Sequence, residues 1–172
     1  QFNDDITGWD VSSVEDLYRT FYGALSFNQD ISDWNMPNLV SLHMTFDRAI
    51  SFNQPIGSWD VSGVMDMHRL FNEAESFNQD LSEWDDNVSN VEDMSAIFSF
   101  AYALSTENRC VIHNVFSSNN SWPYDWEGYC YGAVVGCTDE FACNYDDNAL
   151  SEESYDPYSL CTYIQDDECD CD

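Results

Sequence analysis

The sequence predicts an α/β repeat solenoid of four 25-residue coils, followed by a small disulfide-rich C-terminal module. Three observations lead to this prediction. A nine-residue stretch recurs as QFNDDITGW, SFNQDISDW, SFNQPIGSW and SFNQDLSEW, and its Phe and its Trp return every 25 residues. Each unit also contains one segment with helical periodicity and one that suits a strand. All 7 cysteines lie beyond the repeats, in the last part of the chain.

Apolar residues occupy equivalent places in all four units, as expected when each coil buries its faces against its neighbours. The columns are Phe2, Phe27, Phe52 and Phe77; Ile6, Ile31, Ile56 and Leu81; Trp9, Trp34, Trp59 and Trp84; Leu17, Leu42, Met67 and Met94; and Phe21, Phe46, Phe71 and Phe98. The last two columns shift by two residues in the fourth unit, because Asp86 and Asn87 lengthen it.

The segment that begins at Ser12 predicts a short helix in each unit. Val14, Leu17 and Phe21 are three and four residues apart, which places them on one helical face. Ser12 and Glu15 have the spacing of a capping box.

The segment 30–36 predicts a short strand, stacked in parallel on its equivalents in the other coils. It carries Ile31, Trp34 and Met36 and is bounded by residues typical of turns. At the bends, a column of asparagines is expected to satisfy backbone groups. Its members are Asn3, Asn28, Asn53 and Asn78.

The unit FNQDISxW…V…L/M…F…A resembles the repeat of BspA-like leucine-rich-repeat surface proteins, a group with many mycoplasma-type surface lipoproteins. The segment 104–130 resembles the cap that closes such arrays, and GCTDEFACNYDDNA resembles a short Cys-rich module that often follows them. The resemblance implies a leucine-rich-repeat-like solenoid displayed outside the cell or particle, and it does not imply an enzyme. The expected domains are a four-coil solenoid at 1–101, its cap at 102–132 and a Cys-rich acidic module at 133–172.

The charge is strongly negative. With 33 acidic and 4 basic residues, the net charge is -29, which disfavours nucleic acids and anionic membranes as partners. No apolar run is long enough to span a membrane. The charge favours divalent cations and basic surfaces, although an acidic surface also serves simply to keep a protein in solution.

The cysteines indicate an oxidising, extracellular location. They are Cys110, Cys130, Cys137, Cys143, Cys161, Cys169 and Cys171. A disulfide between Cys110 and Cys130 would close a loop and contribute about 3 kcal/mol. The pairing of the other five stays open, and zinc is disfavoured because no CxxC pair is present. No signal peptide is visible, and since residue 1 falls inside a repeat, we expect this sequence to be part of a longer chain.

Calcium is the one cofactor that the sequence suggests, because two acidic segments offer clustered oxygen ligands. The first carries Asp139, Asn144, Asp146, Asp147 and Asn148, and the second carries Asp166, Glu168, Asp170 and Asp172. Neither matches a full EF-hand loop, and a solvated acidic tail is the alternative. Two aspartate columns on the repeats are expected to form turns instead. They are Asp5, Asp30 and Asp80, and Asp10, Asp60 and Asp85.

The residues for catalysis are sparse. His43 and His68 share a column, with Tyr18 one coil before them. Stacked histidines suit a metal, but no carboxylate completes the three-ligand set of a zinc site, and exposed helix residues are the alternative reading. Since the thiols are expected in disulfides and the repeated aspartates share one environment, we expect no enzymatic activity.

Two sequons, at Asn87 and Asn119, are candidate glycosylation sites. The expected function is that of an extracellular structural or adhesive protein, a rigid unit of a surface assembly such as a filament, appendage or envelope. Its partners are then copies of itself or other surface proteins. The alternative is a monomeric recognition module that binds a host protein or a glycan through the sheet face. An assembly unit should expose aromatic residues outside the columns, namely Tyr102, Trp122, Tyr124 and Trp126.

Overall fold

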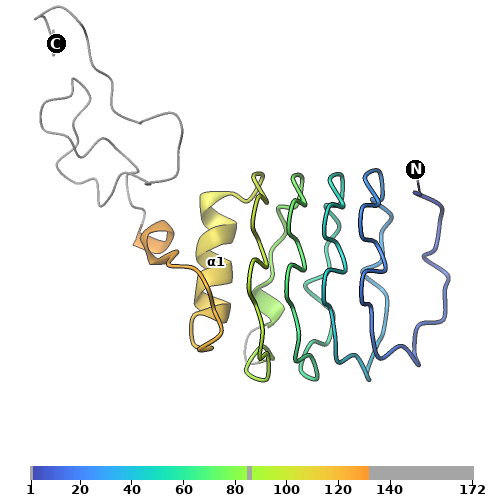
Figure 1. The fold of residues 1–172 in the computed structure, drawn as a ribbon, viewed down its shortest axis with the longest axis horizontal. Coiled ribbons are helices and arrows are strands. Elements are labelled where there is room, and N and C mark those ends of the chain that lie inside the picture. The colour runs from blue at the N-terminus through green and yellow to red at the C-terminus, as the bar shows by residue number, and fades with distance from the viewer. Residues whose placement is uncertain (1, 85–86, 132–172) are drawn as a thin grey trace, which may run out of the picture. The chain divides into compact units, whose positions relative to one another are not determined.

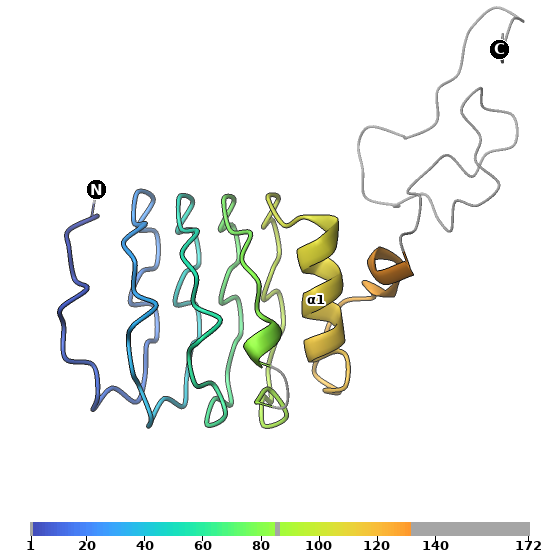
Figure 2. The ribbon, with the colours of Figure 1, turned by 180° about the vertical axis from the view of Figure 1, so that it is seen from behind.

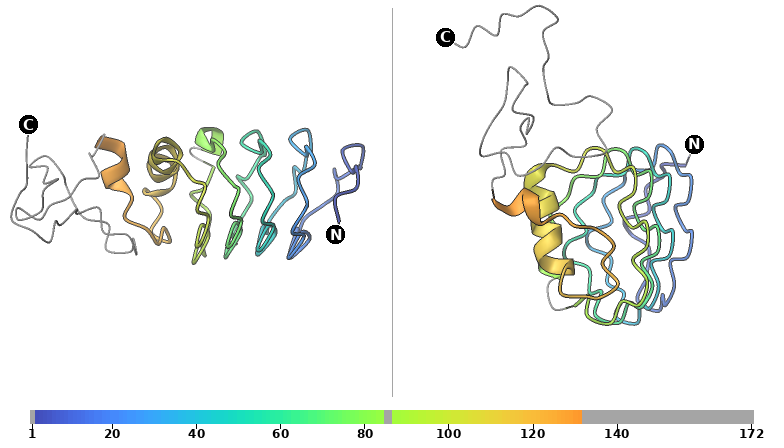
Figure 3. Two further views of the ribbon diagram at one scale, coloured as in Figure 1. Left: turned by 90° about the horizontal axis from the view of Figure 1, so that it is seen from above. Right: turned by 60° about the vertical axis from the view of Figure 1, so that its left-hand side comes forward.

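The computed structural model describes residues 2–84 and 87–131 and divides the chain into two units, Gln1–Trp126 and Glu127–Asp172. In the first unit, four turn-rich coils lie side by side in a row (Figure 1). We number them coil 1 (2–25), coil 2 (26–50), coil 3 (51–75) and coil 4 (76–103). The same row is seen from behind in Figure 2 and from above in Figure 3.

Regular secondary structure is scarce in the described residues. The 3-10 helix η1 (Ser82–Trp84) lies in coil 4, and the α-helix α1 (Thr106–Phe116) follows that coil. A second 3-10 helix, η2 (Glu127–Tyr131), belongs to the second unit.

The predicted α/β repeat solenoid is therefore wrong. The described coils contain neither the repeated helix after Ser12 nor the repeated strand at 30–36, and both segments consist of turns and irregular backbone. Within the described parts of the coils, the β pairing is limited to isolated parallel bridges. These bridges are Asp16↔Ser41, Ser41↔Asp66 and Asp66↔Asp93.

Backbone hydrogen bonding explains why the helix does not form. An α-helix needs each N–H to reach the carbonyl four residues earlier. Here the N–H of Leu17 donates to Ser41 O of the neighbouring coil 2 at 3.1 Å. The N–H of Thr20 donates within its own coil, to Leu17 O three residues earlier, at 3.0 Å. Bonds to the neighbouring coil and bonds to the third residue back alternate in this way along the segment.

Left-handed residues stop a helix at the same places. Two residues per coil, four positions apart, have φ between 53° and 67°. They are Arg19 and Gly23, Met44 and Arg48, Arg69 and Glu73, and Ala96 and Phe100. Single left-handed residues reverse a chain and do not continue a helix. The predicted capping box is absent too, because the N–H and hydroxyl of Ser12 both donate to Asp10 Oδ1.

The core is a double column of phenylalanines that runs through the coils. Phe46 and Phe52 stack with ring centres 3.9 Å apart, and Phe52 continues to Phe77 of the next coil at 6.2 Å. The tryptophan column runs beside it, with 6.4 Å between Trp34 and Trp59. These rings are buried, and burial of each contributes about 1.5–3 kcal/mol.

The expectation for the asparagine column is confirmed. The N–H of Asn53 donates to Asn28 Oδ1 at 2.9 Å, and Gln54 Nε2 donates to Asn28 O at 3.0 Å. The same contacts recur at each step along the row, so the repeated FNQ triplet links each coil to the one before it.

Helix α1 covers the end of coil 4. Its Ile112, Val115 and Phe116 are buried, and Phe116 meets Phe98 edge-on at 6.3 Å. Ser105 caps the helix by accepting the N–H of Asn108 at 3.2 Å. Three of the aromatic residues expected at the surface also pack against this end of the core, whereas Tyr102 is 68% exposed. The three are Trp122, Tyr124 and Trp126.

Candidate functional site

Polar side chains of two neighbouring columns form the first candidate site, which we call the histidine face. One column contains Asp16, Ser41, Asp66 and Asp93, and the other contains Tyr18, His43, His68 and Ser95. The parallel bridges hold the first column in register, and the second lies two residues further along each coil.

His43 is fixed by a carboxylate of the next coil. Its Nδ1 lies 2.8 Å from Asp66 Oδ2, while Asp66 Oδ1 accepts the N–H of His68 at 2.8 Å. An ionised carboxylate has no hydrogen to donate, so Nδ1 of His43 carries the proton of this bond.

His68 is fixed in the same sense by Ser95, whose Oγ lies 2.6 Å from His68 Nδ1. The Ser95 hydroxyl donates its hydrogen to Asp93 Oδ1, so it can only accept from His68. The bonds from the Ser95 hydroxyl and N–H lower the pKa of Asp93. In its neutral form, each imidazole therefore carries its hydrogen on Nδ1 and a lone pair on Nε2.

The histidine face does not form a full metal cage. Within residues 2–84 and 87–131, no three His, Cys, Asp or Glu side chains are gathered closely enough to hold a metal ion.

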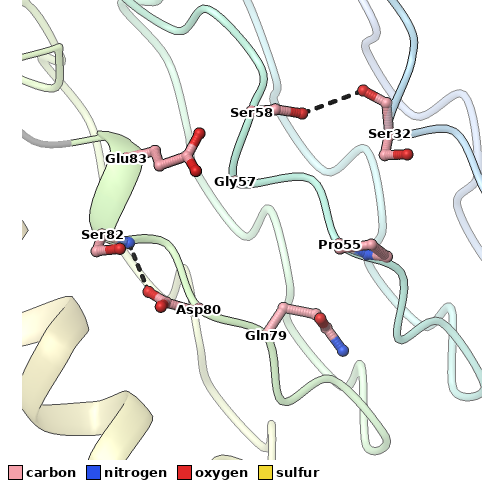
Figure 4. A pocket seen from close by; sticks show the side chains of 8 residues that line it. All are labelled: Ser32, Pro55, Gly57, Ser58, Gln79, Asp80, Ser82 and Glu83. Atoms are coloured by element: carbon pink, nitrogen blue, oxygen red, sulfur yellow. Dashed lines mark hydrogen bonds between the residues drawn. The ribbon is translucent and has the colours of Figure 1, made fainter.

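The second candidate site is a hollow of about 310 Å³ on coils 2, 3 and 4 (Figure 4). Its lining consists of Ser32, Pro55, Gly57, Ser58, Gln79, Asp80, Ser82 and Glu83. Coil 3 departs from the repeat at this point, with Pro55 and Gly57 in the places that aspartate and serine occupy in coils 2 and 4. The smaller residue at 57 is required by close packing, since a Cβ there would lie 2.8 Å from Asp80 O.

Part of the lining is committed to holding the coils together. Ser58 Oγ donates to Ser32 O at 3.2 Å, and the N–H of Ser82 donates to Asp80 Oδ1 at 2.8 Å (Figure 4). The lining thus combines carboxylates, hydroxyls and an amide with the apolar ring of Pro55. Such a rim suits the hydroxyl groups and C–H face of a sugar.

Sequence reasoning missed a buried charge. Asp47 is 0% exposed, and its Oδ1 accepts from Asn72 Nδ2 at 2.9 Å. Its Oδ2 lies 3.1 Å from Arg69 Nε. This cluster joins coils 2 and 3 and has a structural role. In the sequence, the residue that follows each column phenylalanine is polar at Asp47, Asn72 and Ser99, but the residue type is not repeated from coil to coil.

The aspartate columns form turns, as predicted. Asp30 Oδ1 accepts the N–H of Ser32 at 3.0 Å and its hydroxyl at 2.7 Å, and these bonds lower the pKa of Asp30. Asp5, Asp10 and Asp60 make the same contacts with the residue two positions on, and their pKa values are lowered for the same reason. Asp85 lies outside the described residues.

Cys110 and Cys130 are both disulfide-bonded. The other predicted cysteines, 137, 143, 161, 169 and 171, lie outside the described residues. So do both calcium segments, from Asp139 to Asn148 and from Asp166 to Asp172.

The two sequons differ in their surroundings. Asn119 Nδ2 donates to both Val88 O and Val91 O at 2.9 Å. Among the described residues, Asn87 Nδ2 donates to Glu83 O at a long 3.5 Å. An N-linked glycan replaces one hydrogen of Nδ2, so Asn87 can accept a glycan at less cost to the fold than Asn119.

A family model described as a Mycoplasma protein of unknown function, DUF285, matches residues 1–110. No curated protein and no solved structure matches the chain. Among the described residues, no helix has the length and apolar character needed to cross a membrane.

Proposed function

Since the chain belongs to the DUF285 family, a Mycoplasma surface-protein-related group that includes BspA-like repeat proteins, we propose that it is a non-enzymatic extracellular protein with a structural or adhesive role. In this role it is a rigid building unit of a surface assembly, and it binds other copies or other surface proteins.

The observation that carries the proposal is how the repeated side chains are used. Asn28 and Gln54 bond one coil to the next, and Trp59 Nε1 reaches back to Ile31 O at 3.0 Å. Because the repeated residues serve contacts between coils, their recurrence supports a mechanical role better than a row of identical catalytic sites.

Disulfide bonding supports the extracellular location. Disulfides persist in oxidising compartments, and both Cys110 and Cys130 are disulfide-bonded. The net charge of -29 suits a protein that must stay in solution among other surface molecules.

Labelling of intact cells and sedimentation of the purified chain test the two parts of this proposal. An antibody against the chain should label intact, unpermeabilised cells of the organism that makes it. Sedimentation velocity should show self-association, or co-sedimentation with a surface extract. Labelling only after permeabilisation would overturn the surface location, and a chain that remains a monomer and binds no surface component would overturn the structural role.

A second candidate function, recognition of a glycan, is favoured by the hollow around Pro55. The chain should then bind a subset of sugars on a glycan array. Pro55→Asp, which restores the residue of coils 2 and 4, should abolish this binding, whereas Ser62→Ala, outside the hollow, should leave it unchanged. Equal binding by both variants would exclude the hollow as the sugar site.

A further inference from the structure

Two half-buried imidazoles lie against each other on the histidine face. His43 and His68 have ring centres 4.9 Å apart with 40° between the ring planes, and each side chain is 26% exposed. Adjacent coils place them in register, so the contact follows from the repeat itself and not from a flexible loop.

The Nε2 atoms of His43 and His68 are available to bind a ligand. Nδ1 of His43 donates to Asp66, and Nδ1 of His68 donates to Ser95, which leaves a lone pair on each Nε2. Among the described residues, neither Nε2 takes part in a hydrogen bond or an ion pair, and neither is one of the buried polar atoms that lack a partner. Both Nε2 atoms therefore reach solvent.

This is the arrangement in which proteins present histidine to transition metals. A metal-bound histidine donates its other ring N–H to a carboxylate, a carbonyl or a similar acceptor, which fixes the ring and its tautomer. Two nitrogens that bind one zinc ion at 2.0–2.1 Å are at most about 4.2 Å apart. The ring centres of His43 and His68 are 4.9 Å apart, so the two rings must turn toward each other for both lone pairs to reach one ion.

We propose that His43 and His68 bind one divalent first-row transition-metal ion through their Nε2 atoms, with water completing the coordination. Asp66 and Ser95 are positioning residues, since they act on the metal through the two rings. The site is independent of the proposed surface role.

The ligand set selects the class of metal. Imidazole suits Cu²⁺, Ni²⁺ and Zn²⁺, with Cu²⁺ bound most tightly, whereas Ca²⁺ and Mg²⁺ require oxygen ligands. The described ranges supply no group of three His, Cys, Asp or Glu ligands, so the site is open and exchangeable and not a structural metal cage. The net charge of -29 raises the local concentration of any cation around it.

Copper titration of the full chain tests the proposal. With Cu²⁺ at neutral pH, the electron paramagnetic resonance spectrum should show coupling to two imidazole nitrogens at one copper per chain. His43→Gln and His68→Gln should each weaken binding at least tenfold, and the matched control His113→Gln, on α1, should bind as the original chain does. Oxygen-only coordination, or equal affinity in all three variants, would overturn the proposal.

Two further measurements separate metal binding from a loss of structure. Asp66→Asn keeps both histidines but weakens the bond that orients His43, and should lower the affinity about tenfold or more. If a variant does not fold, nuclear magnetic resonance of the unaltered chain still decides. Substoichiometric Cu²⁺ should broaden the imidazole signals of His43 and His68 and spare His113, and equal broadening of all three, or of none, would sink the proposal.

Discussion

At the scale of single residues, the neighbouring coil decides what a polar side chain does. Asn119 illustrates this, because both hydrogens of its Nδ2 donate to carbonyls of coil 4, and the hydroxyl of Ser121 donates to Glu92 O at 2.8 Å. The triplet Asn119-Asn120-Ser121 reads as a sequon in the sequence, yet its contacts fasten the segment after α1 to the coil.

Asn119→Asp should therefore destabilise the protein. The new carboxylate oxygen would face the carbonyls of Val88 and Val91 without a hydrogen to donate, at a cost of about 1–3 kcal/mol. Urea unfolding measures the change. Asn87→Asp, at the other sequon, is the matched control and should change the free energy of unfolding by less than about 0.5 kcal/mol. Equal effects at both positions would show that the Asn119 contacts do not stabilise the fold.

The second prediction at this scale concerns the buried carboxylate of Asp47 and its partner Arg69. Arg69→Met should destabilise the protein by about 2 kcal/mol, because it removes the cation beside a fully buried carboxylate. This value is lower than for a fully buried pair, since the Arg69 side chain is 32% exposed. Methionine already occupies the equivalent left-handed position at Met44, so the backbone should accept it.

Arg48→Met is the control for this prediction. Arg48 pairs with Glu73 at 3.2 Å on the surface, where both side chains are substantially exposed. Such pairs contribute little, so the variant should unfold at nearly the same urea concentration as the original chain. A loss as large as that of Arg69→Met would mean that burial of Asp47 is not the cause.

At the scale of elements, the left-handed residues distinguish these turns from the helix that the sequence suggested. Ala96 has φ of 55°, where a Cβ is unfavourable, whereas Ala103 has no positive φ. Ala96→Gly should stabilise the protein by about 0.5–1 kcal/mol, and Ala103→Gly should destabilise it by a similar amount. Thermal unfolding should show a higher melting temperature for Ala96→Gly and a lower one for Ala103→Gly than for the original chain. In a helix, glycine would destabilise at position 96 as well.

The sequence predicted which residues are buried better than it predicted their backbone conformation. The column of Phe27, Phe52 and Phe77 was identified from its 25-residue period, and all three are buried. The helix was wrong because turns closed by bonds to the third residue back, as from Thr20 to Leu17, space apolar residues three and four apart, as a helix does. Periodicity alone does not separate these two structures.

The histidine face shows the same limit. The 25-residue period placed His43 beside His68, and the structure agrees. The partners of the two rings could not be predicted, because Asp66 and Ser95 belong to other coils and the direction of the Nδ1 bonds depends on the turn geometry. The sequence analysis did not identify the hollow, because its lining comes from three coils and Pro55 and Gly57 are changes in a single copy of the repeat.

At the scale of the whole molecule, two opposing effects set the response to pH. The net charge of -29 causes repulsion at neutral pH, and protonation of carboxylates relieves it. The turn aspartates act in the other direction, because bonds from serine hydroxyl and N–H groups hold the pKa of Asp30, Asp60 and Asp93 below the usual 3.8. A carboxyl with a lowered folded pKa contributes stability above its unfolded pKa and loses it as the pH falls through the folded value.

The melting temperature should therefore pass through a maximum on the acidic side of neutrality. It should rise as the pH falls from 7, because repulsion weakens, and drop below the usual aspartate pKa of 3.8, where the turn aspartates gain protons and lose their bonds. Calorimetry from pH 7 to pH 3 measures both the rise of the melting temperature and its drop at acid pH, which we call the acid limb. Salt separates their causes, since about 1 M NaCl shortens the Debye length to about 3 Å and should raise the melting temperature at pH 7 while leaving the acid limb in place. A melting temperature that is insensitive to salt at pH 7 would mean that the charges are too far apart to strain the folded chain, and the acidic composition would then serve solubility alone.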